Sequence, residues 1–172
     1  MPIRIIVPAP SLPTLNISLA EAIQEKDYIL IIDSVHPVMN IDIISLCKST
    51  PQHWRMQSTI QKQHDILIAT LVRELLISAN LKFTDLSAYA VVTGPGSWIG
   101  SRVGISAIKA FHLIHPHPII ELNSIPGEEN QYFNNLKNLI TMKFTNENFT
   151  PIEKLEPFYG KEYLVNGKEY KI

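Results

Sequence analysis

A run of glycines between a strand pattern and a helix pattern constrains the fold of this chain most. In residues 91–111, VVTGPGSWIGSRVGISAIKAF, the glycines Gly94, Gly96 and Gly100 fall within seven positions. The residues before Gly94 are apolar, and those after Gly100 have helical periodicity. Many proteins bind a phosphate at a glycine turn that leads from a strand into a helix. The stretch therefore raises the question whether this turn binds a phosphate or has another role.

The patterns on either side of the turn indicate an α/β fold. Short β-branched runs predict strands at residues 27–33, 40–46, 54–60, 87–93 and 117–122. Apolar periodicity predicts helices at residues 64–79, 100–114 and 128–142. This order is typical of a parallel α/β arrangement preceded by an antiparallel meander. Residues 1–26 are expected to be a peripheral extension with a short helical piece at 18–26, residues 27–125 the main domain, and residues 126–172 a shorter C-terminal segment.

The end of the chain predicts a β-hairpin. In the sequence KEYLVNGKEYKI, Asn166 and Gly167 suit a type I′ turn, whose two central residues need positive φ. That register places Tyr163 opposite Tyr170, and it places Glu162 opposite Lys171.

Composition excludes several classes of protein. The chain has 172 residues and a net charge of −1, so it lacks the basic field of a strong nucleic-acid binder. Its one cysteine, Cys47, fits a reducing compartment and is expected to be a small buried side chain. Prolines interrupt the N-terminal apolar run, and no run of about 18 apolar residues exists. A cytoplasmic protein without a membrane span is therefore expected.

The glycine turn is open to two interpretations. A nucleotide-binding α/β enzyme could use residues 94–100 as a Rossmann-type turn, with Glu121 placed to bind a ribose. Three features disfavour it: the glycine spacing is one residue too long, Pro95 has no N–H, and Trp98 adds bulk. The alternative is a tight turn followed by a closely packed helix. No cofactor is expected on this second interpretation.

Both helices that flank this turn have more apolar surface than one buried face needs. In residues 64–79 the expected core face is Ile68, Leu71, Val72, Leu75, Leu76 and Ala79. A second stripe of Ile66, Leu67 and Ile77 lies among Thr70, Arg73 and Glu74. In residues 100–114 we expect Val103, Ala107, Ala110, Phe111 and Ile114 to bury on the sheet, and Ile105 and Ile108 to face outward beside His112. The two outer stripes predict packing against each other or against a partner.

The glycine stretch resembles a known family motif. DLSAYAVVTGPGSWIGSRVGISAIKAF is similar to the motif of the TsaB family, also called YeaZ, at Gly94, Pro95, Gly96, Ser97, Gly100, Arg102, Gly104 and Lys109. The sequence upstream, QHDILIATLVRELLISANLKFTDL, resembles that family's helix and the step after it. This chain departs from the motif at Ile99 and Ser101, and most of the family's second domain has no counterpart in it.

The resemblance implies an actin-like, ribonuclease H-like fold and a part in the threonylcarbamoyl modification of tRNA adenosine. Family members are non-catalytic partners of the transferase subunit TsaD, and the ATPase subunit TsaE joins the assembly. The family contact uses the two helices that match residues 64–79 and 100–114. The resemblance therefore implies an interface, which could also serve a homodimer. The residues implied are Ile66, Leu67, Thr70, Arg73, Glu74, Ile77, Ile105, Ile108 and His112.

Other chemically active side chains indicate no catalytic or metal site. His112, His115 and His117 lie close in sequence, but prolines interleave with them and no carboxylate or thiolate is near, so a solvated helix end is expected. Asp65 suits the N-terminal end of its helix better than an acid–base pair with His64. Asp33 matches the position of a catalytic aspartate in active relatives and is interpreted as a relic or a turn former. An endopeptidase-like hydrolase is disfavoured because no metal pair or nucleophile elbow is present.

Overall fold

The computed structural model describes residues 4–6, 27–47, 51–60, 64–124, 129–158, 163–165 and 168–170. For residues 4–6, 64, 129–132, 163–165 and 168–170 it gives the course of the backbone alone.

A six-stranded mixed sheet forms the centre of the molecule. Its strands are β1 (Arg4–Ile6), β2 (Tyr28–Asp33), β3 (Met39–Ser45), β4 (His53–Ser58), β5 (Leu86–Gly94) and β6 (Ile119–Asn123), in the order β1-β4-β3-β2-β5-β6. The meander β2-β3-β4 is antiparallel, whereas β2, β5 and β6 run parallel to one another. The sheet therefore combines the expected meander with the expected parallel half.

The central strands are apolar on both faces because helices cover both faces. From Ile29 to Asp33 every residue of β2 is buried, and so is every residue of β5 from Ala88 to Gly94. Continuous burial is characteristic of strands sandwiched between two layers. This continuous burial explains why the sequences of β2 and β5 are nearly unbroken apolar runs and do not alternate between apolar and polar residues.

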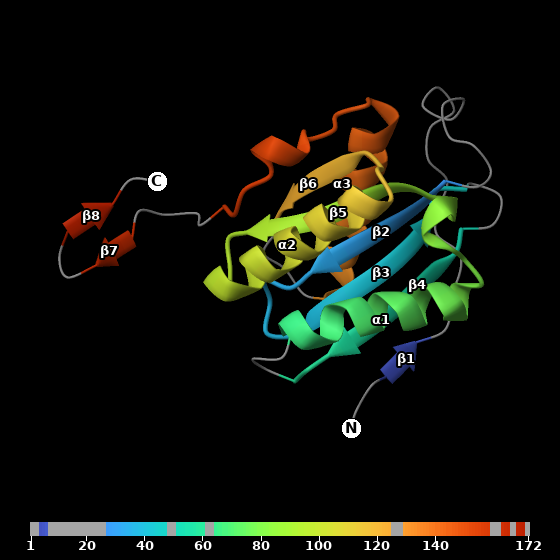
Figure 1. The fold of residues 1–172 in the computed structure, drawn as a ribbon, viewed down its shortest axis with the longest axis horizontal. Coiled ribbons are helices and arrows are strands. Elements are labelled where there is room, and N and C mark those ends of the chain that lie inside the picture. Colours follow the sequence, from blue (N-terminus) through green and yellow to red (C-terminus); the bar gives the residue numbers. More distant parts are fainter. Residues whose placement is uncertain are drawn as a thin grey trace.

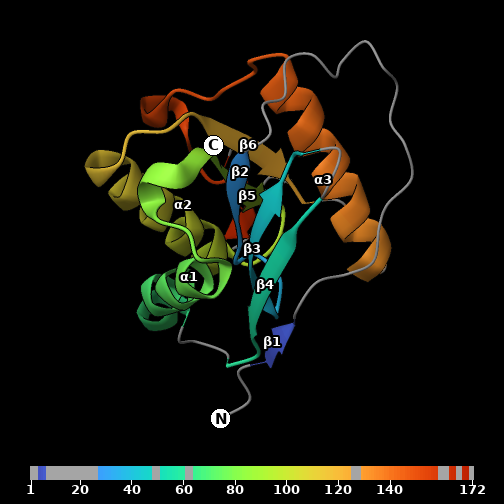
Figure 2. The same cartoon turned by 90° about the vertical axis from the view of Figure 1, so that its right-hand side faces the viewer.

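Two helices cover one face of the sheet and one covers the other (Figures 1 and 2). The first two, α1 (His64–Ala79) and α2 (Trp98–Ile114), lie side by side on one face, and α3 (Glu129–Thr145) lies on the opposite face. Each face has its own apolar core: Leu75 of α1 and Ile108 of α2 belong to one, and Leu136 and Ile140 of α3 belong to the other. The fold is thus a three-layer α/β sandwich.

Most expected elements are confirmed within one or two residues. The helix expected at 64–79 has those bounds, and the helix expected at 128–142 is α3. The C-terminal hairpin forms between β7 (Tyr163–Val165) and β8 (Lys168–Tyr170), with Tyr163 opposite Tyr170 as expected. Its turn at residues 166–167, the 162–171 pair and the helical piece at 18–26 lie outside the described residues. Strand β1 was not expected, since it lies in the N-terminal extension and pairs with β4.

The orientation expected for α2 is wrong. Ile105 and Ile108 are 5% and 0% exposed and belong to the sheet-facing core, whereas Ile114 is 73% exposed. Val103, Ala107 and Phe111 are half-buried against the core on the flank of the helix, and Ala110 is exposed. The physical reason is the pair of small residues one turn apart, Gly100 and Gly104, which are buried and let the helix approach the sheet on the same side as Ile108.

Candidate functional site

The glycine turn packs against the chain's own backbone. A Cβ at Gly100 would collide with the carbonyl oxygen of Ser34, and one at Gly94 would collide with the carbonyl of Phe158. A Cβ at Gly96 would lie 2.7 Å from the carbonyl oxygen of Val35. Gly94 also has φ of +135°, which side-chain-bearing residues rarely adopt. The three glycines of the turn are therefore explained by close packing, which supports the second interpretation of this turn.

Ser34 is the point against which α2 docks. Its hydroxyl is buried and donates to the carbonyl oxygen of Gly100 at 2.7 Å, and the same hydroxyl faces the open side of Gly104. The helix begins at an N-cap, where the hydroxyl of Ser97 accepts a hydrogen bond from the amide of Gly100. Ser97 N also donates to the carbonyl oxygen of Val35 at 2.8 Å. Two of these hydrogen bonds, from Ser34 Oγ and from Ser97 N, thus fix the start of α2 to the residues that follow β2.

Asp33 ends β2 in a buried position. It is 1% exposed, accepts a hydrogen bond from Val35 N at 3.2 Å, and contacts His36 Nδ1 through both carboxylate oxygens, at 2.8 and 3.0 Å. The bond to Val35 N is the turn-forming role expected for Asp33. The hydrogen bond to Asp33 raises the pKa of the His36 ring, and the negative charge of Asp33 raises it further. Partial burial lowers this pKa, but the net result is a pKa above the ordinary value of 6.5. Sequence reasoning missed His36, whose only signal was its place three residues after Asp33.

The other side of His36 reaches Ser124. His36 Nε2 lies 3.0 Å from Ser124 Oγ, although the two residues are 88 positions apart. Ser124 follows β6, and its amide donates to the carbonyl oxygen of Gly94. Because β2, β5 and β6 are parallel, their carboxyl ends meet at one edge of the sheet, where ligands of open α/β folds bind. The glycine turn, His36 and Ser124 lie together at this edge.

The outer face of α1 carries the apolar stripe that its sequence indicated. Ile66 and Ile77 are 71% and 63% exposed, and Thr70 and Arg73 lie exposed between them. Glu74 is hydrogen-bonded by Arg73 at 2.7 Å, and Leu67 is half-buried against the core. The stripe therefore contains two largely exposed isoleucines, with the ion pair of Arg73 and Glu74 beside them.

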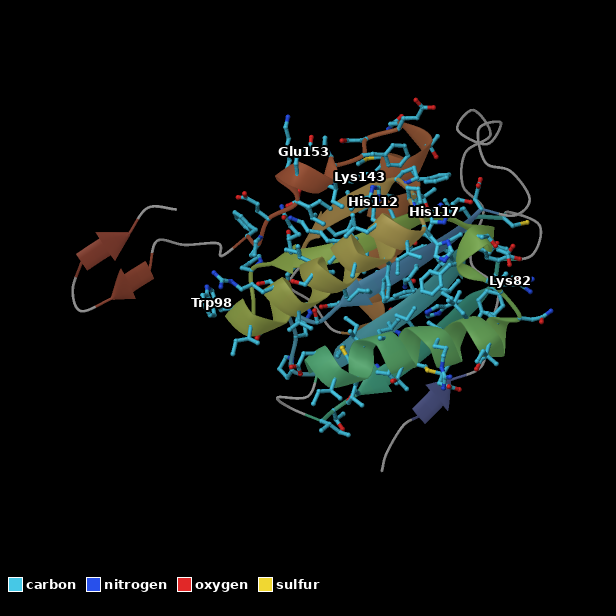
Figure 3. The ribbon with its side chains drawn as sticks, viewed as in Figure 1. Lys82, Trp98, His112, His117, Lys143 and Glu153 are labelled. Atoms are coloured by element: carbon cyan, nitrogen blue, oxygen red, sulfur yellow. The ribbon has the colours of Figure 1, made fainter. Side chains whose placement is uncertain are left out.

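On α2 the outer stripe consists of different residues from those expected. Ile99, Leu113 and Ile114 are 68%, 80% and 73% exposed. Ala110 and Arg102 are also exposed on this helix, and the Arg102 guanidinium lies 3.9 Å from the ring centre of Trp98. Figure 3 shows Trp98 at the start of α2 and His112 near its end. We define the exposed apolar side chains of both helices as the α1–α2 outer face: Ile66, Ile77, Ile99, Ala110, Leu113 and Ile114.

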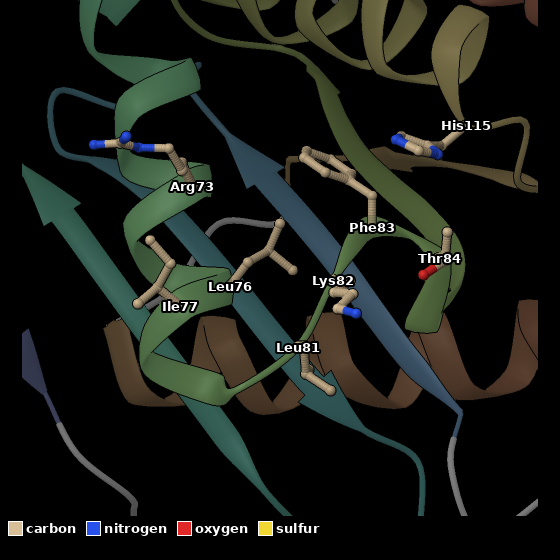
Figure 4. Close-up of a pocket in the computed structure, with 8 residues that line it drawn as sticks. All are labelled: Arg73, Leu76, Ile77, Leu81, Lys82, Phe83, Thr84 and His115. Atoms are coloured by element: carbon tan, nitrogen blue, oxygen red, sulfur yellow. The ribbon is translucent and has the colours of Figure 1, made fainter.

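A shallow cleft lies at the end of α1 (Figure 4). It has a volume of about 380 Å³ and lies between the last turns of α1, the short 3₁₀ helix η2 (Phe83–Asp85) and the end of α2. Ile77 of the outer face also lines it, and so does Arg73 beside that face. The remaining lining residues are Leu76, Leu81, Lys82, Phe83, Thr84 and His115. The cleft is apolar at its base and carries cationic side chains, so it continues the outer face toward η2.

The histidines that follow one another in sequence hold loops together. His112 Nδ1 donates to the carbonyl oxygen of His117, and His117 Nε2 donates to that of Phe83, both at 2.9 Å. The ring of His115 stacks on Phe83. Within the described part of the chain no group of three His, Cys, Asp or Glu side chains could hold a metal ion. These contacts leave His112 half-buried, and its expected place at the interface stays a prediction.

Cys47 is buried beside β3. Its amide donates to Ser45 Oγ at 3.1 Å, and its side chain is 9% exposed. This agrees with the small buried side chain expected from the sequence. Across the described ranges, no helix is both long and apolar enough to span a bilayer.

Solved structures with this arrangement define the class of fold. A crystal structure described as an uncharacterized protein with similarity to peptidase YEAZ from Pseudomonas aeruginosa superposes with a TM-score of 0.52 over 57% of this chain and 44% of that one, at 18% identity. A second structure, described as YeaZ from Pseudomonas aeruginosa, superposes equally well. The domain therefore has the actin-like α/β fold that the resemblance implied.

The sequence matches are to one group of enzymes. Residues 58–135 match the family model described as TsaD: tRNA N6-adenosine threonylcarbamoyltransferase. A protein of that name from Staphylococcus aureus is 24% identical over 118 residues, which are 68% of this chain and 34% of the relative. One from Staphylococcus epidermidis is 36% identical over 74 residues, 43% of this chain and 21% of the relative. The resemblance to the TsaB/YeaZ and TsaD proteins is thus confirmed, and the matched part of the chain spans 34% and 21% of the length of these two curated relatives.

Proposed function

We propose that this protein is a partner subunit in tRNA N6-threonylcarbamoyladenosine synthesis, and that it binds a TsaD-like transferase through the α1–α2 outer face. The observation that carries the proposal is the set of five large apolar side chains on two adjacent helices, each of them more than 60% exposed. Fully burying one isoleucine or leucine contributes roughly 1.5–3 kcal/mol. Five such side chains are sufficient for the apolar centre of a helix-to-helix interface.

The sequence match and the fold support the same system from two directions. The family model names the transferase, and the superposed structures are of YeaZ. In this proposal the chain does not carry out the threonylcarbamoyl transfer itself and works in the cytoplasm with the transferase, joined by a TsaE-like ATPase. The cleft beside Arg73 and Ile77 would accept an apolar side chain of the transferase, and the cations at its rim would favour a carboxylate beside it.

The alternative proposal, a nucleotide-binding enzyme that uses residues 94–100, has less support. The open side of Gly96 faces the carbonyl oxygen of Val35 at 2.7 Å, and Pro95 offers no amide. Titration calorimetry with magnesium-ATP and with NAD distinguishes the two. Micromolar binding that is lost in Gly96→Val would favour the enzyme.

The test of the interface compares surface variants on α1 and α2 with a core variant on α2. Leu113→Asp and Ile77→Asp each place a charge on the α1–α2 outer face, where the side chains are 80% and 63% exposed. We expect both variants to keep the melting temperature of the wild type and to lose co-purification with a TsaD-like transferase. Ile108→Asp is the contrasting core variant and should unfold the chain, because Ile108 is fully buried.

The proposal fails if Leu113→Asp and Ile77→Asp retain the transferase, since the outer face would then not be the interface. Lys109→Gln is the matched charge control, because it also lowers the charge by one unit, at a half-buried position of α2 outside the outer face, and it should leave binding within about threefold of wild type.

A further inference from the structure

Three side chains at the carboxyl edge of the sheet form a hydrogen-bonded chain from the interior toward the surface. Asp33 Oδ2 lies 2.8 Å from His36 Nδ1, and His36 Nε2 lies 3.0 Å from Ser124 Oγ. Asp33 is 1% exposed, the His36 side chain is 35% exposed, and Ser124 is half-buried. A buried carboxylate, an imidazole and a serine hydroxyl in this order is the arrangement that activates a serine nucleophile.

The atoms also have the correct donors and acceptors. A carboxylate only accepts hydrogen bonds, so His36 Nδ1 carries the proton in its bond to Asp33. In the neutral ring Nε2 is then an acceptor, and it faces the Ser124 hydroxyl at 3.0 Å. Asp33 is itself held by the amide of Val35, which fixes the carboxylate toward the ring. The tautomer that a general base needs is therefore the one that the buried carboxylate selects.

Backbone hydrogen bonds hold the surroundings of the three side chains together at one edge of the sheet. Ser124 N is bonded to the carbonyl oxygen of Gly94, and Ser97 N is bonded to that of Val35, next to His36. These bonds bring the N-terminal turn of α2 to the same edge. Three strand ends and one helix start thus converge at this edge of the sheet (Figure 1).

We propose that Ser124 is a nucleophile for activated carboxylic esters, with His36 as its general base and Asp33 as the positioning residue. Ser124 Oγ attacks the ester carbonyl carbon while its proton passes to His36 Nε2. The tetrahedral intermediate then expels the alcohol, which takes that proton from His36, and an acyl-Ser124 remains. Water attacks the acyl group, again giving a proton to His36, and the carboxylic acid and the Ser124 hydroxyl are released. The reaction consumes one ester and one water and gives one acid and one alcohol.

This activity is separate from the proposed partner binding, because none of the three side chains belongs to the α1–α2 outer face. The test treats the full chain with a fluorophosphonate-biotin probe, which reacts with activated serines, and maps the modified residue by mass spectrometry. We expect labelling at Ser124 that is lost in Ser124→Ala and falls about 100-fold in His36→Gln. Ser106→Ala removes an exposed serine of α2 and is the matched control, with labelling unchanged.

The pH profile separates positioning from simple structural support. Labelling of the wild type should rise with pH as His36 loses its proton, with a midpoint above 6.5. In Asp33→Asn the midpoint should move to lower pH, because the carboxylate that raises the pKa of His36 is gone. Absence of labelling above the Ser124→Ala background, with the wild-type melting temperature, overturns the proposal. Labelling that is equal in His36→Gln overturns it as well, and either result leaves the partner proposal untouched.

Discussion

Replacing Gly100 by alanine tests whether α2 is held against the sheet by backbone contact. The new methyl group would occupy the position of the Ser34 carbonyl oxygen, so α2 or the turn after β2 must move. Overpacking of this kind costs about 1–3 kcal/mol. A shift would also lengthen the bond from Ser34 Oγ to the Gly100 carbonyl, now 2.7 Å, which contributes about 1 kcal/mol. The gain in helix propensity from glycine to alanine offsets up to about 1 kcal/mol.

The net expectation for Gly100→Ala is a loss of about 1–3 kcal/mol in the free energy of unfolding, measured by urea titration with circular dichroism. Gly104→Ala should cost less, because its nearest neighbour is the end of a side chain, Ser34 Oγ at 2.5 Å. Ser106→Ala, on the exposed side of α2, should stay within about 0.5 kcal/mol of the wild type. If Gly100→Ala is as stable as Ser106→Ala, the backbone contact does not hold the helix, and the packing explanation of the glycine turn is wrong.

Three further predictions concern buried titratable groups. Burial raises the pKa of Tyr89 to about 12, so an alkaline titration of tyrosine absorbance should show one residue that ionises last and is absent in Tyr89→Phe. Asp42 is 1% exposed and bonded to an arginine and a histidine of β4, so Asp42→Ala should lower the free energy of unfolding by about 3 kcal/mol, while the exposed Asp65→Ala should not. The pKa of His36 is raised in the folded state, so stability from its bond to Asp33 is present below pH 6.5 and lost as pH rises through the folded pKa. The difference in melting temperature between the wild type and His36→Gln should therefore shrink from pH 5.5 to pH 8.5, which thermal scans can measure.

The sequence predicted the layers of the fold well because the apolar patterns are strong. Every strand from β2 to β6 and the α-helices α1, α2 and α3 of the described residues were predicted, because unbroken apolar runs and helical periodicity indicate burial directly. Strand β1 was missed because Arg4–Ile6 is three residues long and lies among prolines, so its pairing with β4 has no local signal. The hairpin register was predicted because the turn chemistry of Asn166 and Gly167 sets it.

The candidate site was predicted only in part, because side-chain orientation depends on tertiary contacts. Either of two apolar stripes on α2 could pack on the sheet, and hydrophobicity alone does not determine which one is buried. The stripe that packs on the sheet contains Gly100 and Gly104, whose lack of a side chain lets Ile105 and Ile108 reach the core. A stripe that combines glycines with large residues is a better indicator of the buried side than one of medium-sized residues. The pairing of His36 with Ser124 spans 88 positions and has no sequence pattern at all.

The place of β2 in the sheet has a consequence for how the chain emerges from the ribosome. Strand β2 (Tyr28–Asp33) pairs on one side with β3, its neighbour in sequence, but on the other side with β5 (Leu86–Gly94). Until residue 94 has been synthesised and released, the meander presents β2 as an unpaired edge whose central residues are all apolar. Such an edge is a template for pairing with other nascent chains. Slower synthesis of the α1 segment prolongs this stage, and we expect it to increase such pairing.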